Sequence, residues 1–228
     1  MQSIYKYTIS LILSLTAFAA YAQDKNIDTL QVKTKWWNGF TMQADLASLV
    51  SSSLQKGETY SMEGGVQVNL KNKYFPIFEL GFAGANKTSA DNIGFKTNGL
   101  FGRLGVDFNL RKSMKDAKPS NNLFMAGVRL GMTSFAYDVT NIKIMDDYWG
   151  GTQQLDFNNQ TTTKVWYEIV VGVRVEVIKN IYMGWSVRSK NLLSKDAVSE
   201  VFPWYIPGYG LNTSSNWGIN YTLGYRFH

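Results

Sequence analysis

The feature that most constrains this chain is a two-residue alternation of apolar and polar side chains that recurs in eight segments. In the clearest segment, residues 60–70, apolar residues and one glycine alternate with small or polar ones. Successive side chains of a β-strand point to opposite faces, so this period predicts strands with one apolar and one polar face. The predicted strands are 39–49, 60–70, 75–84, 98–110, 123–134, 165–177, 181–188 and 217–227.

The number and length of these segments narrow the fold further. A tilted strand crosses a bilayer with roughly ten residues, and eight strands is the smallest common number for an outer-membrane barrel. The chain has 20 glycines, 4 prolines and 14% aromatic residues, a composition that suits a β-barrel. A soluble β-sandwich is the other fold that would use such strands. We predict an all-β fold, an eight-stranded antiparallel transmembrane β-barrel.

The predicted connections alternate between short and long. Short or medium turns fall at 71–73, 111–122 and 179–180, and the turn at 111–122 is basic. Longer joints fall at 50–59, 85–97, 135–164 and 189–216. Transmembrane barrels have short periplasmic turns and longer extracellular loops, so the pattern favours that class over a sandwich.

The N-terminus predicts export. Lys6 precedes an apolar run at 9–19, and Ala20-Tyr21-Ala22 has the small-residue spacing of a signal-peptidase site. The alternative, a membrane anchor, is disfavoured because the run is too short to span a bilayer. We predict a signal peptide at 1–22, a periplasmic tail at 23–36, and an outer-membrane barrel at 37–228 located in the cell outer membrane.

The polar faces of the predicted strands carry acids and arginines in nearly equal numbers. The set is Asp45, Glu63, Glu79, Arg103, Asp107, Arg129, Glu168, Arg174, Glu176, Arg188 and Arg226. A guanidinium can bridge carboxylates while dehydrated, and an eight-stranded barrel is just wide enough for side chains to fill. We therefore predict a lumen filled by a charge network, with a selective pore or proton path as the alternative.

Two aromatic groups have candidate roles outside the lumen. Trp36, Trp37, Tyr74, Phe75, Tyr182, Tyr225 and Phe227 fall near the predicted periplasmic ends and fit a membrane-interface girdle, with a ligand-binding aromatic box as the alternative. In the last long loop, Phe202, Trp204, Tyr205, Ile206 and Tyr209 form a candidate partner-binding surface. The equal alternative is that this loop folds over the barrel mouth and packs on itself.

Catalytic chemistry finds little support in the residue inventory. The chain has no cysteine, and its one histidine is the terminal His228. Lipases, acyltransferases and proteases usually need a histidine base or a comparable acid–base group. The sequence shows none of the phosphate-loop, nucleophile-elbow or metal-ligand motifs, so we predict no catalytic residues, metal or cofactor. A protease that uses carboxylates alone stays a remote alternative.

The second half of the chain resembles a known family. The stretch VWYEIVVGVRVEVIKNIYMGWSVR at 165–188, the segment 205–209 and the ending NYTLGYRF carry the resemblance, together with Tyr148-Trp149-Gly150. These motifs, mainly within 131–227, are similar to those of small outer-membrane β-barrels of Bacteroidota with unassigned function. The resemblance implies an outer-membrane barrel and supplies no catalytic residues.

Together these patterns lead to a functional hypothesis. We expect a non-enzymatic barrel that is a structural or accessory subunit of an envelope complex for outer-membrane protein assembly, secretion or lipoprotein export. Its expected partners are outer-membrane lipid, lipopolysaccharide and proteins of that complex, with no nucleic acid. A small channel or ligand-binding porin is the first alternative, and a lipid-modifying enzyme is the second.

Overall fold

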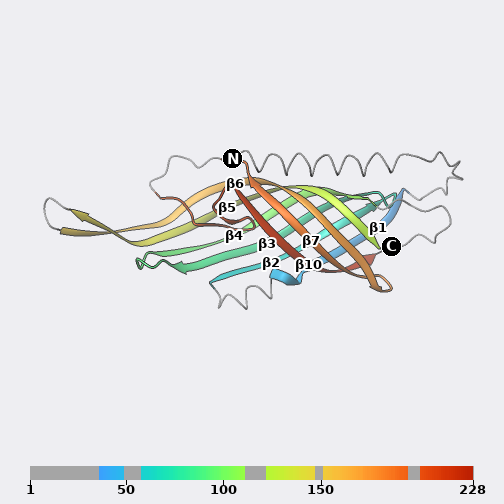
Figure 1. Ribbon diagram of the computed structural model, residues 1–228, viewed down its shortest axis with the longest axis horizontal. Helices are drawn as coiled ribbons and strands as arrows, with labels where there is room; N and C mark the ends of the chain where they lie inside the picture. The colour runs from blue at the N-terminus through green and yellow to red at the C-terminus, as the bar shows by residue number, and fades with distance from the viewer. Residues whose placement is uncertain (1–35, 49–57, 111–121, 147–150, 195–200, 228) are drawn as a thin grey trace, which may run out of the picture. The chain divides into compact units, whose positions relative to one another are not determined.

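Eight long strands form a single antiparallel sheet that closes on itself (Figure 1). The computed structural model describes residues 36–48, 58–110, 122–146, 151–194 and 201–227. The strands are β1 (Trp37–Asp45), β2 (Thr59–Leu70), β3 (Tyr74–Thr88), β4 (Gly94–Asn109), β5 (Leu123–Asp146), β6 (Gly151–Ile178), β7 (Ile181–Leu192) and β10 (Ser215–Phe227), with a small hairpin of β8 (Tyr205–Ile206) and β9 (Gly210–Leu211). The prediction of an all-β, eight-stranded antiparallel fold is confirmed.

From β1 to β7, strands that follow one another in the chain also pair in the sheet, whose order is β1-β10-β7-β6-β5-β4-β3-β2. The β8–β9 hairpin forms a separate sheet between β7 and β10 in the chain. The ring closes where β1 pairs with β10, from Phe40 opposite Phe227 to Asp45 opposite Thr222. Closure explains why the alternating pattern continues to the last residues of the chain. A strand that completes a ring has a partner on both sides, so it does not fray as a free terminus would.

The two faces of the ring differ sharply in polarity. Met42 lies opposite Val66, Val66 opposite Phe78, Phe78 opposite Leu104, and Leu104 opposite Leu130. These five outward side chains are between 37% and 66% exposed. On the other side of the ring, Val171 pairs with Val187 and Val187 with Ile219. The register therefore places exposed apolar side chains in one continuous band, while the charged residues face inward.

Two connections at one end of the ring are tight turns. Lys71 and Asn72 have φ angles of 53° and 55°, and Asn180 has 69°. The Asn72 N–H donates to the side chain of Asn69 at 2.9 Å, which stabilises the turn between β2 and β3. Asparagine tolerates the left-handed region because its side chain bonds to nearby backbone groups. The predicted short turns at 71–73 and 179–180 are confirmed.

Two of the predicted long loops are instead extensions of the strands. β3 extends to Thr88, and β4 already begins at Gly94. Likewise, β5 extends to Asp146, and β6 already begins at Gly151. The outward apolar pattern fails there because Phe135, Tyr137 and Val139 of β5 are buried and residues 158–164 of β6 are all polar. The extended β5–β6 hairpin also has irregular register near Tyr137, Val139 and Ile142. Figure 1 shows this hairpin reaching beyond the other strands.

The irregular register has an identifiable cause at two asparagines. Asn141 and Asn159 have positive φ angles of 65° and 54°. The Asn141 N–H donates to Asp156 at 2.6 Å, and the Asn159 N–H donates to Asp138 at 2.7 Å. Each strand thus carries a bulge that an aspartate on the opposite strand stabilises, and bulges bend a ribbon.

The predicted signal peptide and all of the tail except Trp36 lie outside the described residues, as do 111–121 of the basic turn and Tyr148-Trp149-Gly150. Within the described residues, no helix has the length and hydrophobicity to cross a bilayer.

Candidate functional site

Ten of the eleven charged residues predicted for the interior are buried inside the ring. They are Asp45, Glu63, Glu79, Arg103, Asp107, Arg129, Glu168, Arg174, Arg188 and Arg226. All of them follow the strand parity that also carries the other buried polar side chains. Because the strands alternate strictly through their middle sections, each acid or arginine in the polar set is directed inward.

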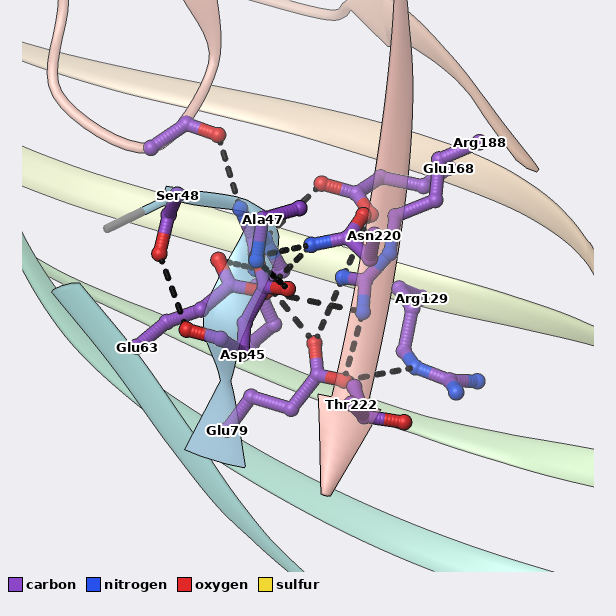
Figure 2. Close-up of polar contacts among 12 residues, drawn as sticks. Asp45, Ala47, Ser48, Glu63, Glu79, Arg129, Glu168, Arg188, Asn220 and Thr222 are labelled. Carbon is purple, nitrogen blue, oxygen red and sulfur yellow. Dashed lines mark hydrogen bonds and ion pairs between the residues drawn. The ribbon is translucent and has the colours of Figure 1, made fainter. Parts of the chain in front are cut away.

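Two arginines join the carboxylates across the interior. The Arg103 Nη1 lies 2.7 Å from Glu63 Oε2, and its Nε lies 2.8 Å from Glu168 Oε1. Arg188 donates to both oxygens of Glu79, at 2.9 and 3.0 Å (Figure 2). Such a two-pronged pair is strong and directional. Together these contacts connect β2, β3, β4, β6 and β7 through the lumen.

Asp45 accepts hydrogen bonds where β1 ends (Figure 2). Its carboxylate accepts from Asn220 Nδ2 at 2.7 Å, from the Tyr221 N–H at 3.0 Å and from the Ala47 N–H at 3.1 Å. Asn220 also donates to Glu63 at 2.8 Å. Asp45 therefore caps the helical turn at 46–48, and its side chain connects the end of β1 to β10 and, through Asn220, to the central cluster.

A second row of polar contacts runs toward the tight-turn end. Arg129 lies 2.8 Å from Asp107 through each of its terminal nitrogens. The Gln67 Nε2 donates to Asp107 at 2.6 Å, and the Gln67 Oε1 accepts from Arg174. Gln67 thus relays between an ion pair and an arginine for which the described residues show no salt bridge.

Phe75 and Tyr182 were predicted for the membrane-interface girdle, and the structure corrects their direction. They are 0% and 1% exposed and lie inside the ring. The Arg174 guanidinium lies 5.4 Å from the Phe75 ring and 5.2 Å from the Tyr182 ring, and Arg226 lies 4.5 Å from Tyr182. The two rings share the parity of the inward residues, and they stack on cations that water would otherwise solvate.

The remaining predicted girdle residues do face outward. Trp36, Trp37, Tyr74, Tyr225 and Phe227 are all at least 40% exposed and lie near the tight-turn end. Phe227 stacks on Phe40 at 4.9 Å, and the Lys71 Nζ lies 4.6 Å from the Trp36 ring. These residues form the outward aromatic cluster.

Glu176 is the one charged residue of the predicted set that is not buried. Its carboxylate accepts the Asn180 N–H at 2.9 Å, in the turn between β6 and β7. Glu176 lies at the rim of the ring because β6 ends at Ile178. Its hydrogen bond stabilises the turn between β6 and β7.

At the opposite end, the last loop closes the mouth of the ring. Ile206 and Tyr209 are 0% and 1% exposed and pack with Trp166 and Phe101 in a small apolar cluster. The Gly208 carbonyl accepts from Arg103 Nη2 and from Lys190 Nζ, each at 2.8 Å. Gly208 has a φ of +78°, and a Cβ there would lie 2.4 Å from the Phe101 ring, so only glycine fits.

This packing corrects the predicted partner surface. Ile206 and Tyr209 lie in the mouth and are not accessible to a partner, whereas Phe202 is 47% exposed. Trp204 stacks on Phe95 at 5.2 Å. Burial raises the pKa of Tyr205 to about 12, so its hydroxyl stays protonated. The alternative that the loop packs over the mouth is the one that the structure supports.

Several residues of the interior were missed, three because their side chains are neutral, and Lys164 and Lys190 because they fall in predicted loops. Asn220 connects two carboxylates, Gln67 connects Asp107 to Arg174, and the Trp166 Nε1 donates to Glu168 at 2.7 Å. Lys190 contacts the loop, and Lys164 is 1% exposed. Strand parity would have found Asn220, Gln67 and Trp166, whereas Lys164 and Lys190 lie just beyond the predicted strands 165–177 and 181–188.

The acids and arginines of the interior pair mostly with one another, and they leave little room for solutes. Within the described residues, no group of three or more potential metal ligands comes together. The interior contains cavities of about 40 and 10 Å³. Outside the ring mouth, a larger cleft of about 640 Å³ lies between the β5–β6 hairpin and the last loop, lined by Val139, Ile142, Phe202, Trp204 and Leu211 among others.

These features define a class: closed antiparallel β-rings with a charged interior and an apolar exterior. Within it, residues 4–227 match a family described as Domain of unknown function (DUF6048), and the chain belongs to that family. The comparison with curated proteins gives no match.

Proposed function

We propose that this protein is a transmembrane β-barrel of the outer membrane that serves as a non-enzymatic structural or accessory subunit of an envelope complex. The complexes that fit are those for outer-membrane protein assembly, secretion or lipoprotein export. The single observation that carries the proposal is the continuous exposed apolar band. Its partners would be outer-membrane lipid, lipopolysaccharide and neighbouring proteins of the complex.

An apolar band of this extent would be energetically unfavourable if water surrounded the ring. Leu100, Leu104 and Phe108 on β4 alone are 71%, 66% and 37% exposed. Burying a large apolar side chain gains about 1.5–3 kcal/mol, and each strand contributes at least one such residue. At about 3.4 Å per residue and a tilt near 45°, the span 100–108 covers about 20 Å, close to the height of a lipid-facing band.

The ends of the ring support the same orientation. The outward aromatic cluster lies beside the tight turns, where aromatic rings would prefer the headgroup level. In the proposed orientation these turns are periplasmic, and the extended β5–β6 hairpin and closed mouth are extracellular. The signal peptide predicted at 1–22 is the matching export route.

The filled interior argues against the channel alternative. Arg103, Arg188 and their carboxylates cross the lumen, and the apolar cluster around Trp166 and Tyr209 closes one end. Conducting barrels have more strands and an aqueous lumen. No second function is favoured by a specific observation.

The parts outside the proposed membrane layer fit a subunit role. Residues 153–163 of β6 pair with β5 alone in the described part of the chain, which leaves a strand edge that another chain can extend. The 640 Å³ cleft with exposed Phe202 and Leu211 lies at the same end of the ring. A strand edge beside an apolar cleft offers a partner both backbone hydrogen bonds and side-chain contacts.

The proposal is tested by extracting the tagged, full-length protein from native envelopes in mild detergent. We expect it in the outer-membrane fraction, insoluble without detergent, together with a protein in fixed stoichiometry. A matched pair of variants, T161P and T161V, then addresses the β6 edge, as argued in the Discussion. Recovery of the wild type as a lone detergent-soluble monomer would refute the subunit role, and a stable detergent-free monomer would refute the membrane assignment.

A further inference from the structure

Arg174 presents a charge problem that its neighbours only partly solve. Its side chain is 3% exposed, and Gln67 and the faces of Phe75 and Tyr182 surround it. Its Nε and Nη2 atoms are buried and lack a hydrogen-bond acceptor among the described residues. A buried guanidinium without such acceptors is costly, so an acceptor not supplied by these residues is expected beside it.

A cavity lies at this position. It has a volume of about 40 Å³, and Arg174, Gln43, Ser186 and Thr222 are among its lining residues. A polar space of this size can hold water or a monatomic ion, since one water needs at least about 10–15 Å³ by the same measure. A polyatomic oxyanion with its hydration would not fit.

The charges around the cavity favour an anion over water. Its charged lining consists of Arg129, Arg174 and Arg188 with Glu79 and Asp107. Asp107 is paired with Arg129, and Glu79 with Arg188, which leaves the charge of Arg174 uncompensated in the lining. One monovalent anion makes the lining neutral.

We propose that the interior cavity beside Arg174 binds a halide, chloride in the cell, as an integral ion of the fold. The Arg174 Nε and Nη2 atoms are its main donors, and the Ser186 and Thr222 hydroxyls complete its surroundings. The site is independent of the proposed membrane role and of any partner, because it depends only on the closed interior.

The test uses the mature chain refolded in detergent with sodium bromide, chloride or gluconate at equal ionic strength. Thermal unfolding is followed by circular dichroism. Halide bound only to the folded state should raise the transition temperature over gluconate, by about 3–6 °C for each tenfold increase above its Kd. Crystals grown in bromide should show an anomalous peak beside Arg174.

Three variants separate a bound halide from a general salt effect. R174M removes the uncompensated charge, and Q43E places a carboxylate at the cavity, so both should abolish the halide preference. Q43M changes the same position without adding charge and should keep it. If R174M does not fold, the Q43E and Q43M pair decides alone. Equal stability in all three salts, a halide preference kept in Q43E, or density for water without an anomalous peak would overturn the proposal.

Discussion

At the scale of the residue, stability depends on arginines that each serve more than one carboxylate. Arg188 contacts Glu79 at 2.9 Å, Glu168 at 3.4 Å and Glu63 at 3.6 Å. Lysine could not replace it, because its ammonium is a single strongly hydrated point, whereas the guanidinium presents donors in a fixed plane. The interior is therefore specified by geometry as well as by charge balance.

Removing the central arginine should be strongly destabilising. We expect R188M to lower the free energy of unfolding by about 3–5 kcal/mol, because three buried carboxylates lose a shared cation. Urea unfolding in lipid vesicles measures this. The double variant R188M/E79Q also removes the charge of Glu79, so its free energy of unfolding should be higher than that of R188M. A loss below about 1 kcal/mol in R188M would show that the interior is more hydrated than its contacts indicate.

Gly208 allows a second residue-scale prediction. G208A should destabilise the closed mouth, because the left-handed backbone costs about 1–2 kcal/mol without glycine and the new Cβ meets the Phe101 ring. G210A is a matched control, since its φ is +118° but a Cβ there has only ordinary contacts with Asn216. Hydrogen exchange over 201–214 should rise more in G208A than in G210A. Equal increases would mean that backbone strain, and not the Phe101 contact, closes the mouth.

At the scale of the element, the β5–β6 hairpin stands apart from the rest of the ring. The pairing of β4 with β5 ends where Gly94 lies opposite Thr140, so the rest of β5 pairs with β6 alone. β6 pairs with β7 only from Trp166 onward. A two-stranded ribbon alone is marginally stable in water. The paired bulges at Asn141 and Asn159, and the bond from Asn141 Nδ2 to the Asn92 carbonyl at 2.6 Å, support it in the described part.

Strand parity identifies which backbone N–H and carbonyl groups of β6 point away from β5, toward the open edge of the sheet. The Val165 N–H donates to Ser194 Oγ at 3.1 Å, and its carbonyl accepts from the Leu193 N–H at 2.9 Å, so both groups point away from β5. In an antiparallel strand, alternate residues repeat this direction, which places the Thr161 N–H on the open edge. Thr161 lies opposite Ala136, before the irregular register begins.

Proline has no backbone N–H, so T161P removes the hydrogen-bond donor that points to the open edge of β6. T161P should therefore weaken partner binding without disturbing the hydrogen bonds between β5 and β6. T161V keeps the N–H and is the matched control. We expect the proportion of the co-purifying protein to fall in T161P and to stay unchanged in T161V. If both variants retain it fully, the edge is not the docking surface, and the cleft lined by Phe202 and Leu211 becomes the surface to test.

At the scale of the whole molecule, the fold reverses the usual distribution of polarity. Across the middle of the ring, arginines and carboxylates fill the interior and large apolar side chains face outward, while buried apolar side chains gather toward the two ends. The two arrangements are complementary, since charges in a dehydrated interior must pair with one another, and exposed apolar side chains are costly in water. We infer that the membrane and the charge network stabilise the ring together.

A single charge in the exposed band tests this inference. L104R should lower stability in lipid vesicles by about 2–4 kcal/mol, the cost of arginine facing the centre of a bilayer. L104M keeps the volume and polarity of the position and should change stability by less than about 1.5 kcal/mol. Urea titration in vesicles compares the two variants. If L104R is as stable as the wild type, Leu104 does not face lipid.

Sequence alone determined which face of each strand is polar, because the alternation is a local property of extended backbone. It also predicted the eight strands of the ring, the tight turns and ten of the buried charges. It misplaced Phe75 and Tyr182, since nearness to a strand end outweighed a parity that already pointed both side chains inward. It also ended β5 too early and began β6 too late, because the apolar side chains of β5 change to the buried face after Thr133 and residues 158–164 of β6 are all polar.

Only the tertiary structure decided which groups meet. Arg188 and Glu79 are separated by 109 positions, and Asn220 and Asp45 by 175, so their contact depends on ring closure and strand register. The same holds for the last loop, whose apolar residues could have faced a partner but lie in the mouth because Arg103 and Lys190 bind its backbone. Alternation sets a direction for each side chain, whereas pairing across the lumen depends on distances that only the closed ring defines.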